Sequence, residues 1–453
     1  MARPTAAGES GWSSRLAFVL AAAGSAVGLG NLWRFPYVTG ENGGAAFVLV
    51  YLGCIAVIGV PLLIAEIVIG RAGRHHEPVA ALATLAGEAG ATRAWGLLGA
   101  MAGLTGLLFL SFYSVIAGWS LAWVAYSASG AVAATVGGAG ELFEAMTASP
   151  TLLVGLHLAF VVLTAAIVVR GVHDGIERAV RVMMPALLVI LLGLILYAAI
   201  ETDQLGAAAR FLFTPDFSRL DAGGVLEAMG QAFFTLSVGV GGMLVYGSFL
   251  RERGVVGRTA LGIAAIDTGV ALLAGLAIFP IVFAFGVEPS AGPGLVFVSL
   301  PNAFAALPFG RVVGTAFFVL VVMAALTSTI SLLELLTEIA AERLDWTRPR
   351  AVLAVSAIYG TLGVAVALSF NVWSDVRILG RGIFDLFDHA TSNLLLPLGG
   401  AGFALFVGWV LSRETLTAEL GFGDGVALRL LRFLLRVVAP AGVLVVLVAA
   451  QLR

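Results

Sequence analysis

The sequence predicts an all-α, polytopic membrane protein, and three observations support this fold class. Of the 453 residues, 60% are hydrophobic and 11% are charged, whereas soluble domains carry about 25% charged residues. The mean hydropathy is +1.03. Runs such as LLVILLGLILYAAI (187–200) are apolar on every helical face, so they lack the alternation that is typical of a membrane β-barrel.

Eleven transmembrane helices are predicted, because a helix needs about 20 apolar residues to cross a bilayer. The apolar runs are 15–38, 43–70, 94–126, 151–170, 177–200, 223–250, 259–286, 305–342, 350–370, 382–411 and 429–451. Several of them are longer than a crossing requires, so tilted or broken helices are expected. No linker of biased composition divides the chain, and residues 1–453 are therefore predicted to form one transmembrane domain.

The arginines predict the orientation in the membrane. Sixteen of them lie in the loops that follow even-numbered spans, at positions 71, 74, 93, 170, 178, 181, 251, 253, 258, 343, 348, 350, 413, 429, 432 and 436. Five lie in the opposite loops, at positions 210, 219, 311, 377 and 381. By the positive-inside rule the N-terminus is cytoplasmic and, after eleven crossings, the C-terminus is outside. Residues 1–14 lack the features of a signal peptide and are expected to form a cytoplasmic tail of a protein in the bacterial inner (plasma) membrane.

Two spans are interrupted by glycines, the first at GSAVGLGN (24–31) and the sixth at SVGVGG (237–242). They occupy corresponding positions if 15–200 and 223–411 are two five-helix repeats of opposite orientation and 429–451 is an additional helix. Paired broken helices in matching positions indicate a transporter binding site near the bilayer midplane. The alternative for either glycine cluster alone is close helix packing through small residues.

Eight stretches of the chain resemble the neurotransmitter:sodium symporter family, in its bacterial eleven-span amino acid transporter branch. They are SRLAFVLAAAGSAVGLGNLWRFPYVTGENGGAAF, PLLIAEIVIGR, LSFYSVIAGW, GIERAVRVMMP, FTPDFSRL, GQAFFTLSVGVGG, DTGVALLAGLAIFP and ALTSTISLLE. The resemblance covers nearly the whole chain. It implies inverted repeats, discontinuous helices 1 and 6, and sodium-coupled import by alternating access, not an enzyme.

The resemblance also implies two sodium sites built from oxygen ligands, which hard cations prefer. A broken helix frees backbone carbonyls for this purpose. The predicted first site comprises Ala26, Asn31, Thr235 and Asp267, completed by the carboxylate of the substrate. The predicted second site comprises Gly24, Val27, Ala324, Thr327 and Ser328. For the TST motif that holds the last two, the alternative is local bonding of the hydroxyls to the preceding helical turn.

For the substrate, the resemblance implies an amino acid held at both ends. Tyr113 and the amides of Leu29 and Gly30 would bind its carboxylate, and carbonyls of Phe234, Thr235 and Ser237 its ammonium. The monoamine branch has an aspartate where this chain has Gly28, so an α-amino acid is predicted in place of a monoamine. Ala26, Gly28 and Ser328 are also assigned to the site. A mostly apolar lining predicts a neutral, hydrophobic or aromatic substrate: Ser25, Phe109, Phe234, Val240, Thr329 and Leu332.

Charged residues inside a membrane are rare and usually functional. The resemblance implies an outer gate in which Arg34 and Asp388 approach each other above Phe234; the alternative is a snorkelling Arg and an interfacial Asp. Glu66 is expected to accept hydrogen bonds from amides that the sixth span frees. Chloride-dependent relatives have Asn at the position of Asp267, so chloride-independent transport, with proton counter-movement as an option, is predicted.

The inner gate is less defined by the sequence. Trp12 is present and Glu342 occupies the family's acidic position, but Glu9 stands where an arginine is usual, and Arg3 is a substitute candidate. Gly175 and Pro185 mark either a hinge in the fifth span or an ordinary kinked helix.

Other classes of protein find little support. The five histidines lack metal-ligand spacing, Cys54 is the single cysteine, and no basic, aromatic-studded region indicates nucleic-acid binding. Two alternatives of the same architecture stay open: a proton-driven amino acid transporter and a non-transporting receptor-like protein. The first is disfavoured by Thr327 and Ser328, because such carriers often replace the second sodium with a positive side chain.

Overall fold

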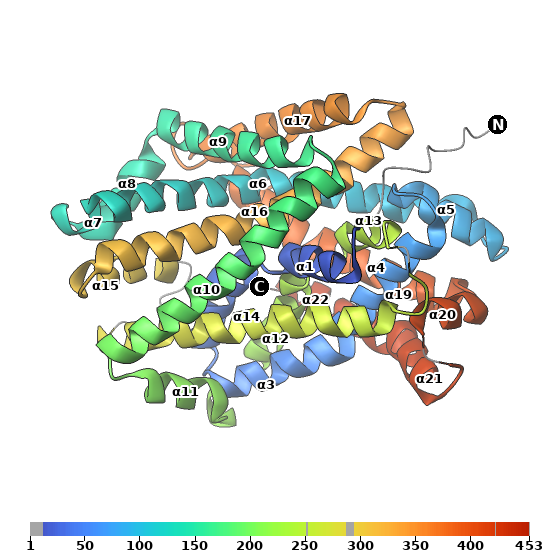
Figure 1. Ribbon diagram of the computed structural model, residues 1–453, viewed down its shortest axis with the longest axis horizontal. Helices are drawn as coiled ribbons and strands as arrows, with labels where there is room; N and C mark the ends of the chain where they lie inside the picture. Colours follow the sequence, from blue (N-terminus) through green and yellow to red (C-terminus); the bar gives the residue numbers. More distant parts are fainter. Residues whose placement is uncertain (1–11, 251, 287–293, 422, 453) are drawn as a thin grey trace.

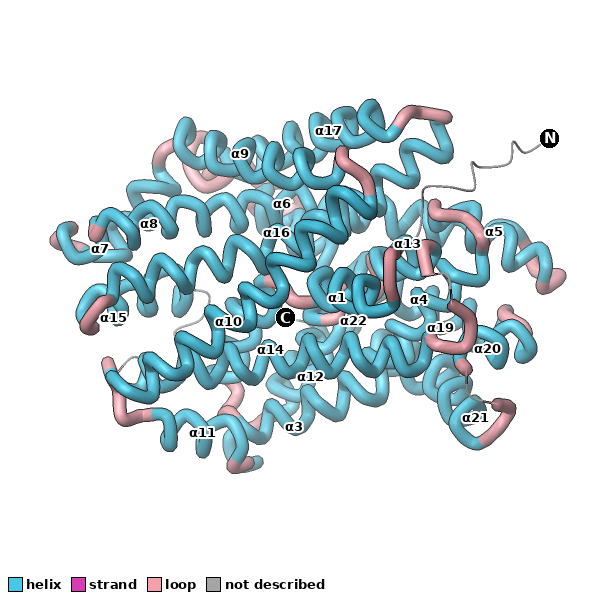
Figure 2. Tube along the Cα trace, in the orientation of Figure 1, coloured by secondary structure: helices cyan, strands magenta, loops and turns pink. Residues whose placement is uncertain are grey.

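A computed structural model describes residues 12–250, 252–286, 294–421 and 423–452. Within these ranges the chain is a bundle of α-helices without strands, apart from one isolated bridge between Ile378 and Arg381. Figure 2 shows that mostly short loops and turns join the helices. The helices of the first half are α1 (Arg15–Ala26), α2 (Phe35–Glu41), α3 (Ala45–Cys54), α4 (Val60–Gly73), α5 (Pro78–Glu88), α6 (Gly96–Ser129), α7 (Ala131–Ala134), α8 (Gly138–Ala148), α9 (Pro150–Val168), α10 (Arg178–Glu201) and α11 (Leu205–Phe213).

The second half is equally helical. It contains α12 (Ala222–Thr235), α13 (Gly242–Ser248), α14 (Val256–Ala284), α15 (Leu300–Ala306), α16 (Gly310–Leu344), α17 (Arg348–Leu368), α18 (Ile383–Asp388), α19 (Leu396–Leu405), α20 (Arg413–Leu420), α21 (Val426–Phe433) and α22 (Ala439–Leu452). Wider π-helical turns join or extend several helices: Gly30–Arg34, Ile55–Gly59, Val172–Glu177, Leu295–Ser299, His389–Leu395, Phe406–Val410 and Leu434–Val438. Two 3-10 turns lie at Arg93–Trp95 and Phe217–Arg219.

In the described part of the chain, nine helical stretches are long and apolar enough to cross a membrane. They are Ala45–Gly73, Arg93–Ser129, Pro150–Val168, Val172–Glu201, Val256–Ala284, Gly310–Leu344, Arg348–Leu368, Ile383–Val410 and Val426–Ala449. A tenth consists of Arg15–Ala26 and Gly30–Glu41, which meet at a bend of 52°. The predicted sixth span is divided between α12 and α13, of 14 and 7 residues, so neither piece reaches the length of a crossing alone.

The short helices gather at the two ends of the bundle. In Figure 1, α7, α8, α11 and α15 lie at one end and α5, α20 and α21 at the other. Of the first group, α7, α8 and α11 fall within residues 127–149 and 201–222, two segments that lie between the predicted spans. An ion pair between Arg71 and Glu419 (3.1 Å) fastens α20 to α4 at the other end.

The centre of the bundle is formed by α16, which packs along α6, α9, α17 and α1. Its fully buried Glu334 pairs with Arg348 at the start of α17 (2.5 Å), and Arg348 also donates to the carbonyl of Val168 at the end of α9 (2.8 Å). On the same side of the bundle, buried His157 of α9 contacts the carbonyl of Gly360 in α17 (3.0 Å). These polar contacts link three long helices into a fixed frame beside the broken ones.

The start of the described chain contacts α13 and the beginning of the fifth span. Trp12 donates from Nε1 to the carbonyl of Tyr246 (3.2 Å), and the backbone amide of Ser13 donates to Glu177 (3.1 Å). Arg181 also contacts this Glu177 carboxylate. Glu342, the predicted acid, faces the loop before α5 instead, where it contacts His75 (2.7 Å). The candidate partners Arg3 and Glu9 lie outside the described residues.

The fifth span begins with an irregular turn. Gly175 lies inside the π-helical turn Val172–Glu177, and a Cβ atom there would approach the carbonyl oxygen of Ile167 to 2.2 Å. Pro185 lies inside the regular helix α10, ten residues further along. Both proposed elements of the hinge are therefore in one continuous helical stretch, Val172–Glu201.

Candidate functional site

The break in the first span lies between α1 and the π-helical turn that begins at Gly30. Two amides that the break removes from the helical pattern are bound by side chains: Gly28 N–H donates to Asn31 Oδ1 (2.9 Å) and Leu29 N–H to Tyr113 Oη (3.1 Å). A Cβ atom on Gly28 would lie 2.5 Å from Ser328 Oγ and 2.9 Å from Tyr113 Oη. Position 28 therefore has no room for a side chain, acidic or otherwise.

The break in the sixth span comprises residues 236–241, between α12 and α13. Ser237, Gly239 and Gly241 adopt positive φ angles of 50°, 97° and 83°. At Gly239 only glycine fits, because a Cβ atom would lie 2.1 Å from the carbonyl oxygen of Leu396. Fully buried Glu66 accepts a hydrogen bond from the Gly239 amide (2.5 Å), which confirms the role predicted for Glu66.

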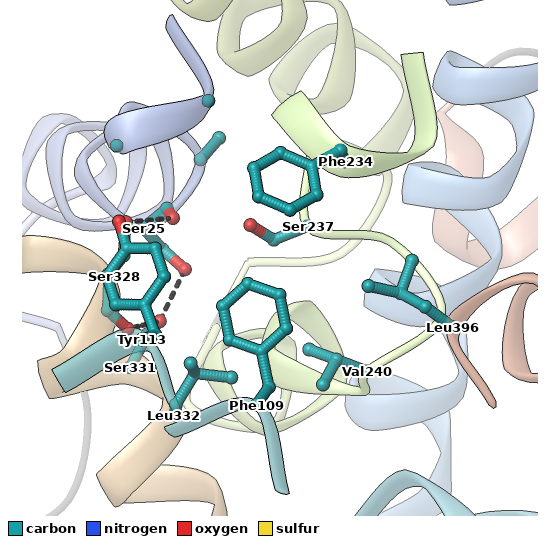
Figure 3. Close-up of a pocket in the computed structure, with 13 residues that line it drawn as sticks. Ser25, Phe109, Tyr113, Phe234, Ser237, Val240, Ser328, Ser331, Leu332 and Leu396 are labelled. Carbon is teal, nitrogen blue, oxygen red and sulfur yellow. Dashed lines mark hydrogen bonds between the residues drawn. The ribbon is translucent and has the colours of Figure 1, made fainter. Parts of the chain in front are cut away.

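The two breaks border one cavity, shown in Figure 3. The rings of Phe109 and Phe234 and the Ser237 side chain face this space, opposite Tyr113 and Ser25. None of its lining residues is charged, so the cavity suits a ligand whose side chain is neutral. The lining residues are Ser25, Ala26, Gly28, Gly30, Phe109, Tyr113, Phe234, Ser237, Val240, Ser328, Ser331, Leu332 and Leu396.

The structure corrects part of the predicted lining. Thr329 does not line the cavity; its hydroxyl contacts Thr164 Oγ1 (3.0 Å) on the other side of α16. Ser331, which sequence reasoning missed, lines the cavity and accepts a hydrogen bond from Ser25 Oγ (2.7 Å). Residues three and four apart share a helix face, so the face that contains Ser328 also contains Ser331 and Leu332. That spacing was the available signal.

Three other differences concern residues at the edge of the cavity. Leu29 takes part through its backbone amide, as described above, and its side chain is buried elsewhere. Thr235 turns its hydroxyl to Asp267 and away from the cavity. Leu396, at the start of α19, lines the cavity and was not predicted, because no local pattern connects it with residues more than 60 positions earlier.

A cluster of buried oxygens adjoins the first break. Asn31, Thr235 and Asp267 are all fully buried and joined to one another. Asn31 Nδ2 donates to Asp267 Oδ1 (2.8 Å) and to Thr235 Oγ1 (3.1 Å), and Thr235 Oγ1 donates to Asp267 Oδ2 (3.0 Å). The structure thus brings three of the four residues predicted for the first sodium site into direct contact, while the fourth, Ala26, ends α1 beside them.

A second cluster lies between α1 and α16. Thr327 Oγ1 contacts the carbonyl oxygens of Ala324 (2.9 Å) and Val27 (3.3 Å). Ser328 Oγ contacts the carbonyl of Ser25 (3.2 Å). Both the local bond along α16 and the bond across to the broken helix are therefore present. Gly24 belongs to the same place, since a Cβ atom on it would lie 3.5 Å from Cβ of Thr327.

A larger cavity of about 350 Å³ adjoins the first and shares Phe234 and Tyr113 with it. Arg34 and Asp388 both line this second cavity. The Arg34 guanidinium lies over the Phe234 ring, 4.7 Å from its centroid, a distance typical of a cation–π contact. Asp388 accepts a hydrogen bond from Ser392 Oγ (2.8 Å); the ion pairs of the described residues do not include Arg34 with Asp388.

Two facing helix breaks, an uncharged cavity between them and two adjacent clusters of buried oxygens form the arrangement of a secondary transporter. Comparison with known proteins identifies the transporter family. The model of the sodium:neurotransmitter symporter family matches residues 9–136 and 141–452. The chain belongs to this family, and it is an integral membrane protein of a family of sodium-dependent transporters.

Individual relatives agree with this assignment. The chain is 37% identical over 446 residues to the uncharacterized sodium-dependent transporter YhdH of Bacillus subtilis, with 96% of each chain covered. It is 34% identical over 410 residues to an uncharacterized sodium-dependent transporter of Haemophilus influenzae, covering 89% of this chain and 90% of that one. The crystal structure of MhsT in complex with L-phenylalanine matches with a TM-score of 0.89 and 44% identity, over 98% of this chain and all of that one.

Proposed function

We propose that the protein imports a neutral, hydrophobic or aromatic L-α-amino acid together with two sodium ions, by alternating access. The observation that carries this proposal is the uncharged cavity between the helix breaks, which adjoins the buried Asn31–Thr235–Asp267 cluster. The similarity to MhsT, whose crystal structure holds L-phenylalanine, supports the substrate class.

The substrate's carboxylate would be held at the first break. Tyr113 Oη already contacts the Leu29 amide, so a carboxylate there would meet a hydroxyl and backbone amides at the end of a half-helix, where anions are favoured. The ammonium would meet carbonyl oxygens of Phe234, Thr235 and Ser237 at the second break. Position 28 carries no acidic side chain, and a Cβ atom there would crowd Ser328 and Tyr113. The ammonium of an amine that lacks a carboxylate would therefore have no anionic partner at this position.

Sodium is a co-transported substrate in this proposal. The first ion would be held by Ala26, Asn31, Thr235 and Asp267 and by the carboxylate of the amino acid. That carboxylate is the coupling device, because each ligand then completes the site of the other and the two affinities are linked reciprocally. The second ion would be held by Gly24, Val27, Ala324, Thr327 and Ser328. Their carbonyl and hydroxyl oxygens are the donors that hard cations prefer.

The proposed transport cycle uses the two cavities in turn. The substrate enters through the cavity of about 350 Å³, and Phe234, Arg34 and Asp388 close above it. The broken helices then rock against the frame of α6, α9, α16 and α17 to open the inner side. We further propose eleven crossings in two inverted repeats, 15–200 and 223–411, with 429–451 as an additional helix. The N-terminus is then cytoplasmic and the C-terminus is outside.

Uptake into proteoliposomes tests the function. L-Phenylalanine accumulation is expected when an inward sodium gradient is imposed and is expected to be absent when potassium replaces sodium. Accumulation driven by a pH gradient without sodium would support the proton-coupled alternative. Sodium-dependent binding of L-phenylalanine without accumulation would indicate a receptor.

Chloride is not expected to be required. Asp267 places a fixed carboxylate beside Asn31 and Thr235, and such a charge balances sodium without a second anion. Initial uptake rates should therefore agree within experimental error when gluconate replaces chloride at constant sodium. A collapse of uptake in gluconate would show that the carboxylate does not serve this purpose.

Ser331 and Thr329 provide a matched pair of variants on opposite sides of α16. Ser331→Val places a larger side chain in the lining, which makes the cavity smaller, and removes the acceptor of the Ser25 hydroxyl. We expect L-phenylalanine binding to weaken about tenfold, because overpacking typically costs about 1–3 kcal/mol. Thr329→Val removes the contact with Thr164 and the hydrogen bond to the Leu326 carbonyl, and neither lies at the cavity. It should therefore lower stability by about 1–2 kcal/mol and leave affinity unchanged. Titration of each variant with L-phenylalanine in sodium checks this, and a larger affinity loss for Thr329→Val would contradict the assigned face.

A further inference from the structure

A cavity of about 440 Å³ is lined by residues 409–437, in the last part of the chain, and shares no residue with the candidate site. It is an open cavity bordered by the π-helical turn Phe406–Val410, the start of α20, α21 and the π-helical turn Leu434–Val438. Four of its eight lining residues are arginines, and none carries a carboxylate. The lining residues are Trp409, Arg413, Leu428, Arg429, Arg432, Phe433, Arg436 and Val437.

The arginines have few partners in the protein. Arg432 Nη2 (3.3 Å) and Arg436 Nε (2.6 Å) both donate to one acceptor, the carbonyl oxygen of Gly408. Arg432 Nε is buried without a hydrogen-bond partner among the described residues. Arg436 lies over the Trp409 ring at 4.7 Å, and Arg413 pairs with Asp424 at 2.5 Å.

Arg429 is the most available of the four. Its side chain is exposed and forms no hydrogen bond or ion pair with the described residues. A guanidinium carries five N–H donors, so the four side chains hold many more donors than these acceptors use. Four cations in one small cavity repel each other unless an anion is present. A phosphate is the anion that arginine forks match best, since they bind it bidentately.

An exposed apolar strip runs alongside the arginines on the same helical stretch, Val426–Ala449. Its exposed fractions are 72% for Val426, 55% for Leu430, 54% for Phe433 and 48% for Val437. These residues recur every three to four positions, so they share one helix face. The strip is suited to acyl chains, whereas a free phosphate has no apolar part that could contact it.

We propose that this cavity binds the phosphate headgroup of an anionic phospholipid, whose acyl chains lie along the strip of Val426, Leu430, Phe433 and Val437. The helices α20 and α21, which border the cavity, lie at the same end of the bundle as α5 (Figure 1), the end that the arginine distribution predicts to be inside. The cytoplasmic leaflet attracts clustered arginines through its anionic lipids. The bound lipid then bridges α20, α21 and the two π-helical turns Phe406–Val410 and Leu434–Val438.

Lipid binding to the purified full-length protein tests this proposal. Native mass spectrometry and thermal stabilisation are measured with phosphatidylglycerol, phosphatidylcholine and inorganic phosphate. Phosphatidylglycerol is expected to bind and stabilise, and the other two are not. Arg429→Gln should weaken phosphatidylglycerol binding about fivefold, the effect of one arginine near an anionic surface, and Arg429→Glu should weaken it further.

Arg258→Gln is the matched control, because Arg258 is another exposed arginine at the predicted inner end, at the start of α14. It should bind phosphatidylglycerol like the unmodified protein. Since Arg429 is exposed and without described partners, its variants should fold, which gel filtration and L-phenylalanine binding verify. Equal binding of both phospholipids, equal effects of the Arg429 and Arg258 variants, or equal stabilisation by inorganic phosphate would each overturn the proposal.

Discussion

Asp267→Asn is expected to lower the affinity for sodium about 100-fold and to abolish sodium-driven uptake of L-phenylalanine at ordinary sodium concentrations. Asp267 is fully buried and is held by Asn31 and Thr235, and its partners in the proposed first sodium site are neutral. Losing one member of a buried charge pair typically costs about 3–5 kcal/mol, because the other charge is left uncompensated. The substitution keeps the size of the side chain, so the effect isolates the charge.

Sodium titrations of L-phenylalanine binding measure this effect. Asp216→Asn serves as the control, since Asp216 is an exposed carboxylate that caps a short turn through Ser218. The control should bind sodium like the unmodified protein. If Asp267→Asn kept its sodium affinity within a factor of about three, Asp267 would not be a sodium ligand and the proposed first site would be wrong.

Gly28→Ala is expected to reduce L-phenylalanine binding to background. The added Cβ atom would lie 2.5 Å from Ser328 Oγ and 2.9 Å from Tyr113 Oη, both too close for non-bonded atoms. Tyr113 would then move away from the Leu29 amide, and the proposed carboxylate site would lose its hydroxyl. Crowding alone explains the loss, because Gly28 is not among the residues with positive φ angles.

Gly262→Ala is the matched control for this change. Gly262 lies within α14, and a Cβ atom there meets no other atom within 4 Å. Alanine favours a helix over glycine by about 1 kcal/mol, so this control should be slightly more stable and bind normally. Normal L-phenylalanine affinity in Gly28→Ala would contradict the placement of the carboxylate at the first break.

Much of the architecture was predictable because a membrane helix requires a run of about 20 mostly apolar residues, which the sequence shows directly. Nine of the eleven predicted runs correspond to helical stretches of the described chain that are long enough to cross a membrane, and a tenth corresponds to the bent pair Arg15–Ala26 and Gly30–Glu41. The run 223–250 is divided between α12 and α13. The glycine clusters at 24–31 and 237–242 are where these two runs break. The partner of Glu66 was also predictable, because a buried acid next to a broken helix needs amide donors. In each case the determining pattern lies within a few residues or in one short motif.

The features that the sequence did not predict depend on the direction of side chains around a helix or on contacts between segments that are distant in the sequence. Thr329 and Ser331 are two positions apart on α16, so they point to different faces, and only the face settles which one meets the cavity. Leu396 reaches the cavity through tertiary packing of α19. The contact of Trp12 with Tyr246 likewise joins segments more than 200 residues apart. The π-helical turns inside 382–411 leave no comparable mark in an apolar sequence.

The proposed mechanism requires that sodium and the amino acid complete one shared site. Its most direct test is L-phenylalanine binding to purified protein, measured by thermal stabilisation in sodium and in potassium, and sodium binding measured with and without L-phenylalanine. We expect each ligand to raise the affinity for the other by the same factor, about tenfold or more. Equal stabilisation by L-phenylalanine in sodium and in potassium would contradict the shared site.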